Sequence, residues 1–232
     1  MPDEKTVYAS EAERYERLIL REDYRHNIES AIREIVKVKG LDVVDLGAGT
    51  GRLAGMLAAD AAHIFAFDTS HHMLTVTRDK LRLLAPGRAL VAAADHRHVP
   101  LPSRSVDLVI SGWSVSYLAV WDPEHWRLAL EMWLAGMKRL LRPGGTVILL
   151  ESLGTGNDSP IHLPHLENFY PWLDEAGFEN TWIRTDYRFE SVDEAAQLAG
   201  FFFGDEMSER IRREKLLILP ECTGLWWKRI QG

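Results

Sequence analysis

The stretch of residues 43–51, Val-Val-Asp-Leu-Gly-Ala-Gly-Thr-Gly, constrains this chain more than any other. Its apolar start is typical of a buried parallel strand, and glycines then follow at three alternate positions. Glycine adopts backbone conformations that other residues avoid, and it lets a ligand approach the main chain closely. The sequence therefore predicts a strand that ends in a tight, ligand-binding turn.

The spacing of these glycines argues against two common nucleotide motifs. The dinucleotide fingerprint needs a further glycine where this chain has Arg52. The phosphate-binding loop that ends in Lys-Ser or Lys-Thr is also absent. A pyrophosphate would favour bare amides at a helix start, whereas an ammonium group would favour Asp45 or the carbonyls of the turn. Both kinds of ligand remain open at this point.

Residues 45–51 match the first motif of the class I S-adenosylmethionine-dependent methyltransferases, Asp-Leu-Gly-x-Gly-x-Gly. The chain resembles this family over roughly residues 40–152. The resemblance implies an α/β fold with a Rossmann-like, doubly wound, seven-stranded sheet, mostly parallel with an antiparallel last strand, in three α/β/α layers. It also implies S-adenosyl-L-methionine as cofactor and S-adenosyl-L-homocysteine as product. In the family this loop holds the methionine end of the cofactor, which here implicates Asp45, Gly47, Ala48, Gly49 and Gly51.

A second acidic position follows the predicted strand at residues 63–67. Asp68 lies about 20 residues beyond the glycines, where a carboxylate can accept hydrogen bonds from both ribose hydroxyls. The sequence Asp-Thr-Ser-His-His-Met at residues 68–73 resembles the second element of the family, which implies that Thr69 lies beside the cofactor and that Met73 packs on adenine. Met73 is equally compatible with the core. The two histidines are not at metal-ligand spacing, so no metal site is predicted.

The predicted third strand ends at Asp95 and His96. The resemblance implies that the carboxylate of Asp95 accepts from the adenine amine while the backbone amide of His96 donates to the ring. The alternative is an ordinary turn aspartate. Ser111, at the end of the fourth strand, is also expected near the cofactor. From the N-terminal helix, Tyr24 or Tyr15 either covers the cofactor or simply packs.

The loop after the fourth strand should carry the chemistry, because ligands bind beyond the carboxyl ends of the strands at the switch point of such a sheet. Relatives that methylate amino groups of nucleic acids have Asn or Asp, two prolines and an aromatic residue here, whereas residues 111–114 read Ser-Gly-Trp-Ser. The net charge of −7 also argues against a nucleic-acid partner. Trp113 and Tyr117 either line an acceptor pocket or pack in the core.

The length of 232 residues predicts a single domain over residues 1–232. Within it we expect an N-terminal helix over residues 10–36 that covers the cofactor, and a helical insertion over residues 191–217 between the last two strands. This insertion would be a lid or the surface of a homodimer. The single cysteine allows no intrachain disulfide, and no run of about 18 apolar residues is present, which predicts a cytoplasmic protein with no membrane partner.

These features predict an enzyme that transfers a methyl group from S-adenosylmethionine to a small-molecule acceptor, at an oxygen, nitrogen or carbon atom. The cofactor supplies the reactive group, so a catalytic base is needed only for some acceptors. Candidates for such a base are His162, His165 and Tyr117. The alternatives are a non-catalytic module that binds the cofactor or its product and, more remotely, a nicotinamide-dependent oxidoreductase.

Overall fold

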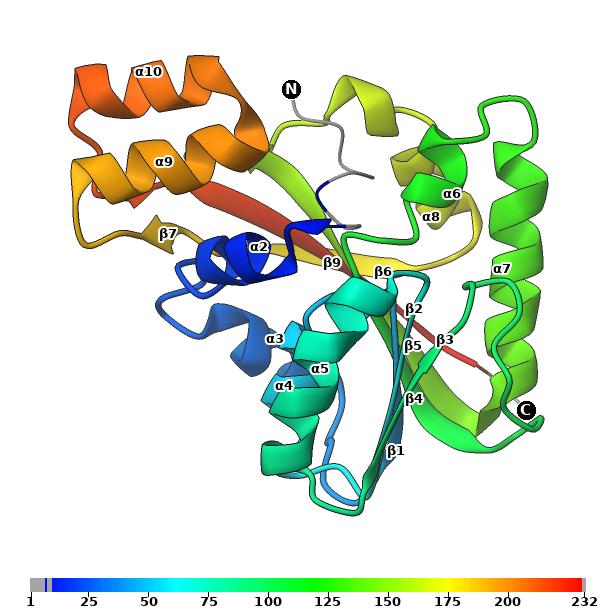
Figure 1. Cartoon of the computed structure of the whole chain (residues 1–232). Coiled ribbons are helices and arrows are strands. Elements are labelled where there is room, and N and C mark those ends of the chain that lie inside the picture. The colour runs from blue at the N-terminus through cyan, green and yellow to red at the C-terminus, as the bar shows by residue number, and fades with distance from the viewer. Residues whose placement is uncertain (1–6, 8–9, 231–232) are drawn as a thin grey trace.

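The computed structural model describes Val7 and residues 10–230, and its centre is a seven-stranded sheet with helices on both faces (Figure 1). The strand order is β3-β2-β1-β4-β5-β9-β6. Strands β1 to β5 are parallel, and β9 runs antiparallel to both β5 and β6. The bounds are β1 Asp42–Leu46, β2 His63–Asp68, β3 Ala89–Ala93, β4 Val106–Gly112, β5 Leu141–Thr155, β6 Glu179–Arg184 and β9 Glu221–Arg229. The predicted fold class is confirmed.

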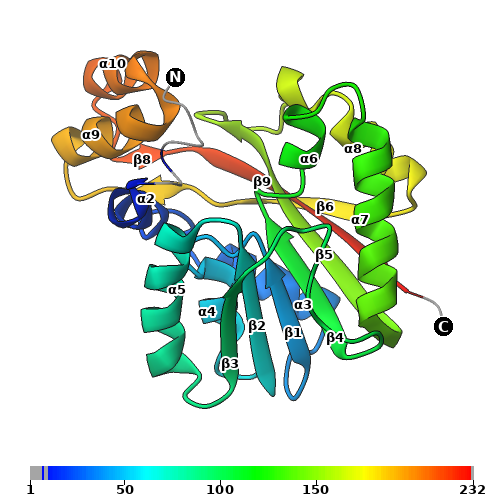
Figure 2. The same ribbon diagram turned by 45° about the vertical axis from the view of Figure 1, so that its right-hand side comes forward.

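The helices form two layers, which Figure 2 shows on opposite sides of the sheet. On one face lie α3 (Asn27–Ile35), α4 (Arg52–Leu57) and α5 (His71–Leu84), whose apolar residues pack with β1, β2 and β4. On the other face α7 (Trp126–Leu140) and α8 (Phe169–Glu175) contribute Trp133 and Trp172 to a second core. The short helices α6 (Tyr117–Val120) and η1 (Pro164–Leu166) lie in the connections. A sheet buried on both faces explains the apolar runs of its strands.

The single helix predicted over residues 10–36 is wrong, because two helices are present. Helix α2 (Ala12–Ile19) ends before α3 begins, and Asp23 and His26 between them have positive φ angles of 57° and 59°. The carboxylate of Asp23 accepts the backbone amides of Asn27 at 2.8 Å and Ile28 at 2.9 Å. A short acidic side chain that binds free amides starts a new helix, and here it interrupts the old one.

The region of residues 191–217 contains two helices, α9 (Val192–Phe203) and α10 (Asp205–Glu214), with a break at Gly204. They lie between two short strands, β7 (Tyr187–Arg188) and β8 (Ile218–Leu219), which pair in a small sheet of their own. A third apolar cluster, which includes Leu18, joins α2 to this insertion.

Within the described part of the chain, no helix has the length and apolar composition needed to cross a membrane.

Buried ionisable side chains tie the N-terminal segment to α4 and the start of β9 to β5. Glu22 is 7% exposed and accepts a hydrogen bond from Nη1 of Arg52 at 2.6 Å. Glu221 is 2% exposed and accepts from the hydroxyl of Ser152 at 2.7 Å. Burial raises the pKa of Glu22, and burial together with the charge of Glu22 raises the pKa of Glu221 to about 8. Glu221 is therefore protonated in the folded protein at neutral pH.

We expect the substitution Glu221→Gln to flatten the dependence of stability on pH. The folded-state pKa is raised above the unfolded value of about 4.3, so the folded protein binds this proton more tightly. The stabilisation is complete below the unfolded pKa and is lost as pH rises through the folded pKa. Between pH 4.5 and pH 8 the wild-type free energy of unfolding should lose about 2 to 4 kcal/mol from this group, and the variant should not lose it.

Urea denaturation of both proteins across this pH range measures the difference. Glu179→Gln, at an exposed position on β6, serves as the control and should keep the wild-type slope. Parallel slopes for wild type and Glu221→Gln would contradict the assignment.

Candidate active site

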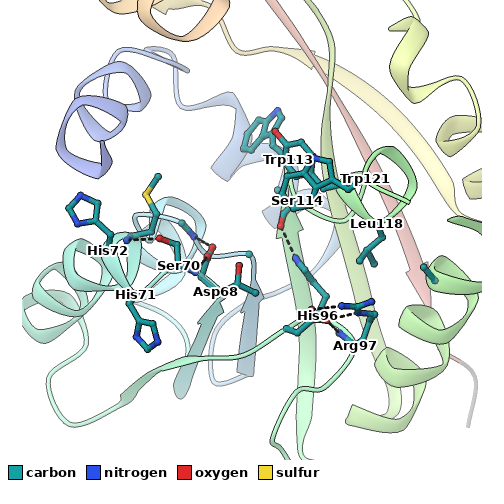
Figure 3. Close-up of a pocket in the computed structure, with 18 of the residues that line it drawn as sticks. Asp68, Ser70, His71, His72, His96, Arg97, Trp113, Ser114, Leu118 and Trp121 are labelled. Carbon is teal, nitrogen blue, oxygen red and sulfur yellow. Dashed lines mark hydrogen bonds and ion pairs between the residues drawn. The ribbon is translucent and has the colours of Figure 1, made fainter. Parts of the chain in front are cut away.

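A cavity of about 740 Å³ opens at the carboxyl ends of the parallel strands (Figure 3). Four chain segments form most of its lining: the glycine turn after β1, the end of β2 with the start of α5, the segment after β3, and the loop after β4 that continues into α6. Tyr15 of α2 and Ala129 of α7 complete it. In Figure 3, Asp68 and Ser70 lie on one side of the cavity, and Trp113, Ser114 and Trp121 lie on the other. This is the switch point of the sheet, where the strand order reverses.

The glycine turn is built for close approach. Gly47 has a φ of +65°, and a Cβ atom at this position would overlap the side chain of Ser114 and lie 3.1 Å from Nε2 of His96. Gly49 has a φ of +54°, and the space around its absent Cβ is open. The hydroxyl of Thr77 donates to the carbonyl of Gly49 at 2.6 Å and fixes the turn from α5. The turn is therefore held in place while presenting a bare backbone to the cavity.

Asp68 ties this turn to the start of α5. One carboxylate oxygen accepts the backbone amide of Gly49 at 2.9 Å, and the other accepts the amide of Ser70 at 2.7 Å. Ser70 in turn caps α5 by accepting the amide of Met73 at 3.2 Å. Asp68, Thr69 and Met73 all line the cavity. Each oxygen of Asp68 keeps a lone pair that a ligand hydroxyl can use.

Asp95 is fixed by its neighbour Arg97, whose guanidinium donates to both carboxylate oxygens at 2.8 and 2.7 Å. These charge-assisted hydrogen bonds lower the pKa of Asp95 to about 2, so the group stays ionised. Next to it, Nε2 of His96 lies 2.7 Å from the hydroxyl oxygen of Ser114. Burial lowers the pKa of His96, which favours a neutral ring. The sequence assigned a role only to the backbone of His96, and its side chain was missed.

Several residues expected at the cofactor do not line the cavity: Asp45, Ala48, Gly51, Ser111 and Tyr24. Asp45 is buried beneath the turn, where its carboxylate accepts the amide of Ala54 at 2.9 Å, and burial raises its pKa to about 7. Ser111 donates to the carbonyl of Leu46 at 2.6 Å and joins β4 to β1. The structure thus gives Asp45 and Ser111 supporting contacts below the site rather than contacts with the cavity.

The other tyrosine considered for the N-terminal region, Tyr15, lines the cavity instead of Tyr24. The ring of Tyr24 lies under the guanidinium groups of Arg25 and Arg188. Of the three candidates for a base, Tyr117 lines the cavity and the two histidines do not. His162 stacks on Tyr170 with ring centroids 4.7 Å apart, and His165 is exposed. The segment that follows β5 therefore does not bring these two histidines to the cavity.

The far half of the cavity is aromatic. Tyr117 and Trp121 stack with ring centroids 4.5 Å apart and an interplanar angle of 18°, and both line the cavity together with Trp113 and Leu118. Trp113 has a φ of +51°, a strained conformation for a bulky residue. The guanidinium of Arg52 lies 5.2 Å from the centre of its ring. Trp121 was missed in the sequence, although its spacing of four residues from Tyr117 is that of one helix face.

A family model described as a methyltransferase domain matches residues 43–145. The matched part of the chain is a class I S-adenosylmethionine-dependent methyltransferase domain. It is 33% identical over 148 residues to a ubiquinone/menaquinone biosynthesis C-methyltransferase (UbiE) of Cupriavidus metallidurans, which covers 59% of this chain and 54% of the relative. It is 34% identical over 119 residues to a demethylmenaquinone methyltransferase of Clavibacter sepedonicus, covering 51% and 44%. The chain thus spans about half the length of the curated relatives it matches.

Solved methyltransferase structures share this fold. One example is an S-adenosylmethionine-dependent methyltransferase from Aquifex aeolicus, with a TM-score of 0.58 and 15% identity, where the match covers 94% of this chain and 98% of the other. The family match begins in β1 and ends at the start of β5. It therefore includes every segment that lines the cavity except that of Tyr15. The methyltransferase match replaces the nicotinamide-dependent alternative.

We expect Asp68→Asn to weaken binding of S-adenosylhomocysteine by at least about tenfold, or roughly 1.5 kcal/mol. Asparagine has one acceptor oxygen, so its amide nitrogen would face the amide of either Gly49 or Ser70, and the charge that favours ribose hydroxyls would be lost. Isothermal titration calorimetry measures the affinity. Asp79→Asn, on the exposed side of α5, is the matched control. Equal affinities for wild type and Asp68→Asn would remove Asp68 from the cofactor site.

Proposed function

We propose that this chain transfers the methyl group of S-adenosylmethionine to a hydroxylated aromatic ring of a small molecule. The observation that carries the proposal is the division of one cavity into two chemically different halves. One half is polar and lies around Gly49, Asp68 and Asp95, and the other is formed by Trp113, Tyr117 and Trp121. The halves meet at Gly47, against which Ser114 packs.

The polar half has the groups that an adenosyl amino acid requires. Asp68 offers two carboxylate oxygens to the ribose hydroxyls, and the ionised Asp95 offers an acceptor to the adenine amine. Met73 supplies a polarisable side chain for the face of the adenine ring. The bare backbone at Gly49 leaves room for the amino-acid end. These donors, acceptors and spaces fit the cofactor of the family.

The aromatic half favours a flat acceptor. Aromatic rings bind other rings through offset stacking and large apolar contact area. Tyr117 and Trp121 already form one stacked pair, and Trp113 presents a further ring from the loop after β4. The names of the relatives point the same way, since they describe a C-methyltransferase of ubiquinone and menaquinone biosynthesis. A quinol is a hydroxylated aromatic ring of this kind.

When bound, S-adenosylmethionine supplies a methyl group on a positively charged sulfur, which reacts by in-line displacement. The chain contributes position and exclusion of water. Asp68 and the glycine turn hold one reactant, and the aromatic wall holds the other. The acceptor would then approach where the ends of β1 and β4 meet, beside Gly47 and Ser114.

A methylation assay with 1,4-naphthoquinol as acceptor tests the proposal. We expect methylated product and S-adenosylhomocysteine in equal amounts, and no turnover with cyclohexane-1,4-diol, which has the hydroxyls but no aromatic ring. Trp121→Ala should raise KM for the quinol about tenfold, because it removes roughly 1.5 kcal/mol of ring contact, and should leave the affinity for S-adenosylhomocysteine unchanged.

Trp182→Ala, which removes a half-exposed tryptophan on β6, is the control for that substitution. Binding of the cofactor without turnover of the quinol would indicate a non-catalytic module or another acceptor class. Absence of cofactor binding by the folded protein would overturn the proposed function as a whole.

We further infer that the insertion of residues 191–217 is a lid. Tyr15 lines the cavity and packs against Phe202 of α9, with ring centroids 5.6 Å apart. Arg210 of α10 donates to the carbonyl of Gly156, just beyond the end of β5, at 2.9 Å. The insertion thus touches Tyr15 in the wall of the cavity and the segment that follows β5.

If this inference is correct, S-adenosylhomocysteine and 1,4-naphthoquinol together should slow amide hydrogen exchange in α9 and α10 several-fold. Exchange in α8, which contributes no residue to the lining of the cavity, should stay unchanged. If the exchange rate in the insertion does not change when both ligands are added, a structural role or a dimer surface would be favoured instead.

A further inference from the structure

The side chain of His96 reaches from the segment after β3 to the loop after β4, where Nε2 lies 2.7 Å from the oxygen of Ser114 (Figure 3). Both side chains line the cavity. The missing side chain of Gly47 provides the space for this contact, because a Cβ atom there would meet both partners. The pair therefore lies at the junction of the polar and aromatic halves.

The other carboxylates of the cavity are poor bases for an acceptor at this junction. Both oxygens of Asp95 accept a hydrogen bond from Arg97, and its pKa of about 2 makes it a weak base. Asp68 is engaged by two backbone amides at the opposite side of the cavity. Asp122 is exposed and bonds to His125. A weak base with a pKa far below neutrality gains little from taking a proton in the transition state.

The remaining histidines of the cavity, His71 and His72, begin α5 and are exposed to solvent. Figure 3 shows them on the side of Asp68, away from Ser114. His96 differs from both in burial and in its hydrogen bond. Among the residues that the structure describes, its Nδ1 is buried and has no hydrogen-bond partner. No protein group thus fixes the ring proton on one nitrogen, so the neutral ring can offer the lone pair of Nε2.

We propose that His96 is the catalytic base of this methyl transfer and that Ser114 passes the proton of the acceptor to its ring. The inference rests on the proposed function. The hydroxyl of Ser114 donates to the single lone pair of Nε2. The acceptor hydroxyl therefore gives its proton to Oγ of Ser114, and Ser114 passes its own proton to Nε2 of His96, as the acceptor atom forms its bond to the methyl carbon. Where that atom is a ring carbon, it then loses its own hydrogen to solvent as the ring hydroxyl is restored. The bond between methyl carbon and sulfur breaks, and its electron pair stays on sulfur. The imidazolium then returns the proton to solvent, so no other reactant is needed.

The electrostatic surroundings suit this role. Burial lowers the pKa of His96, the carboxylates of Asp68 and Asp95 oppose that shift, and Arg97 adds to it. The ring is therefore neutral at pH 7 and able to accept a proton. The rate of methyl transfer should rise with pH through the pKa of His96 and then level off.

Three variants test the proposal on the full-length protein, with 1,4-naphthoquinol as acceptor. His96→Gln keeps a hydrogen-bonding group for Ser114 but takes no proton, so kcat should fall at least about a hundredfold and the pH-dependent rise should vanish. Ser114→Ala removes the hydroxyl that passes the proton but leaves Nε2 open to the acceptor or to a water, so kcat should fall less and the rise should remain. His98→Gln replaces an exposed histidine of the same loop and should behave as wild type.

Two measurements do not depend on turnover. Calorimetry with S-adenosylhomocysteine should give the wild-type affinity for His96→Gln. NMR titration of the histidine rings should show one signal, absent in His96→Gln, whose pKa lies below the ordinary value of about 6.5. That signal should move to a different pKa in Ser114→Ala.

The outcomes separate the two proposals. A wild type that binds the cofactor but does not methylate the quinol overturns the proposed acceptor class and the base with it. A wild type that turns over while His96→Gln keeps its kcat and pH profile overturns the base alone. A His96→Gln protein that has lost S-adenosylhomocysteine binding shows that this residue serves the cofactor and also overturns the inference.

Discussion

The contact between Gly47 and Ser114 sets the geometry of the whole site. It brings the turn after β1 against the loop after β4 at the carboxyl edge of the sheet, with no side chain between the two backbones at Gly47. A hydrogen bond below it holds the same two strand ends together, because Ser111 donates to the carbonyl of Leu46. Asp45 ties β1 to α4 by accepting the amide of Ala54. The cavity exists because these two loops meet at one point and diverge on either side of it.

The polar half of this site follows from local rules, which is why the sequence predicted much of it. Glycines with positive φ, an acid at the end of β2 and a serine cap on α5 each depend on neighbours within a few residues. The strands could likewise be read from their apolar runs and from the turns between them. The single helix over residues 10–36 failed for a local reason as well, since Asp23 binds the free amides that begin α3.

The aromatic half and the side chain of His96 depend instead on how distant loops fold together. Residues 96 and 114 meet only because the chain returns through β4 beside β1, and no pattern around either residue encodes that distance. For the same reason the sequence offered His162 and His165 as candidate bases, whereas His162 packs on Tyr170 and His165 faces solvent. Tyr15 lines the cavity and Tyr24 does not, because α2 packs against the insertion in the position that brings Tyr15 beside Phe202.

Arg52 shows how one substitution in a motif can reorganise what surrounds it. It occupies the position where a dinucleotide-binding chain has its third glycine, and its side chain pairs with the buried Glu22 at 2.6 Å. Removing either partner of a buried pair leaves an uncompensated charge, so the pair fixes the N-terminal segment against α4. The same guanidinium lies over the ring of Trp113, which is held in a strained conformation. Arg52 thus removes the glycine that a dinucleotide site needs and at the same time supports Trp113 in the aromatic half of this cavity. Through its contacts with Glu22 and Trp113, it links the N-terminal segment, the glycine turn and the acceptor half.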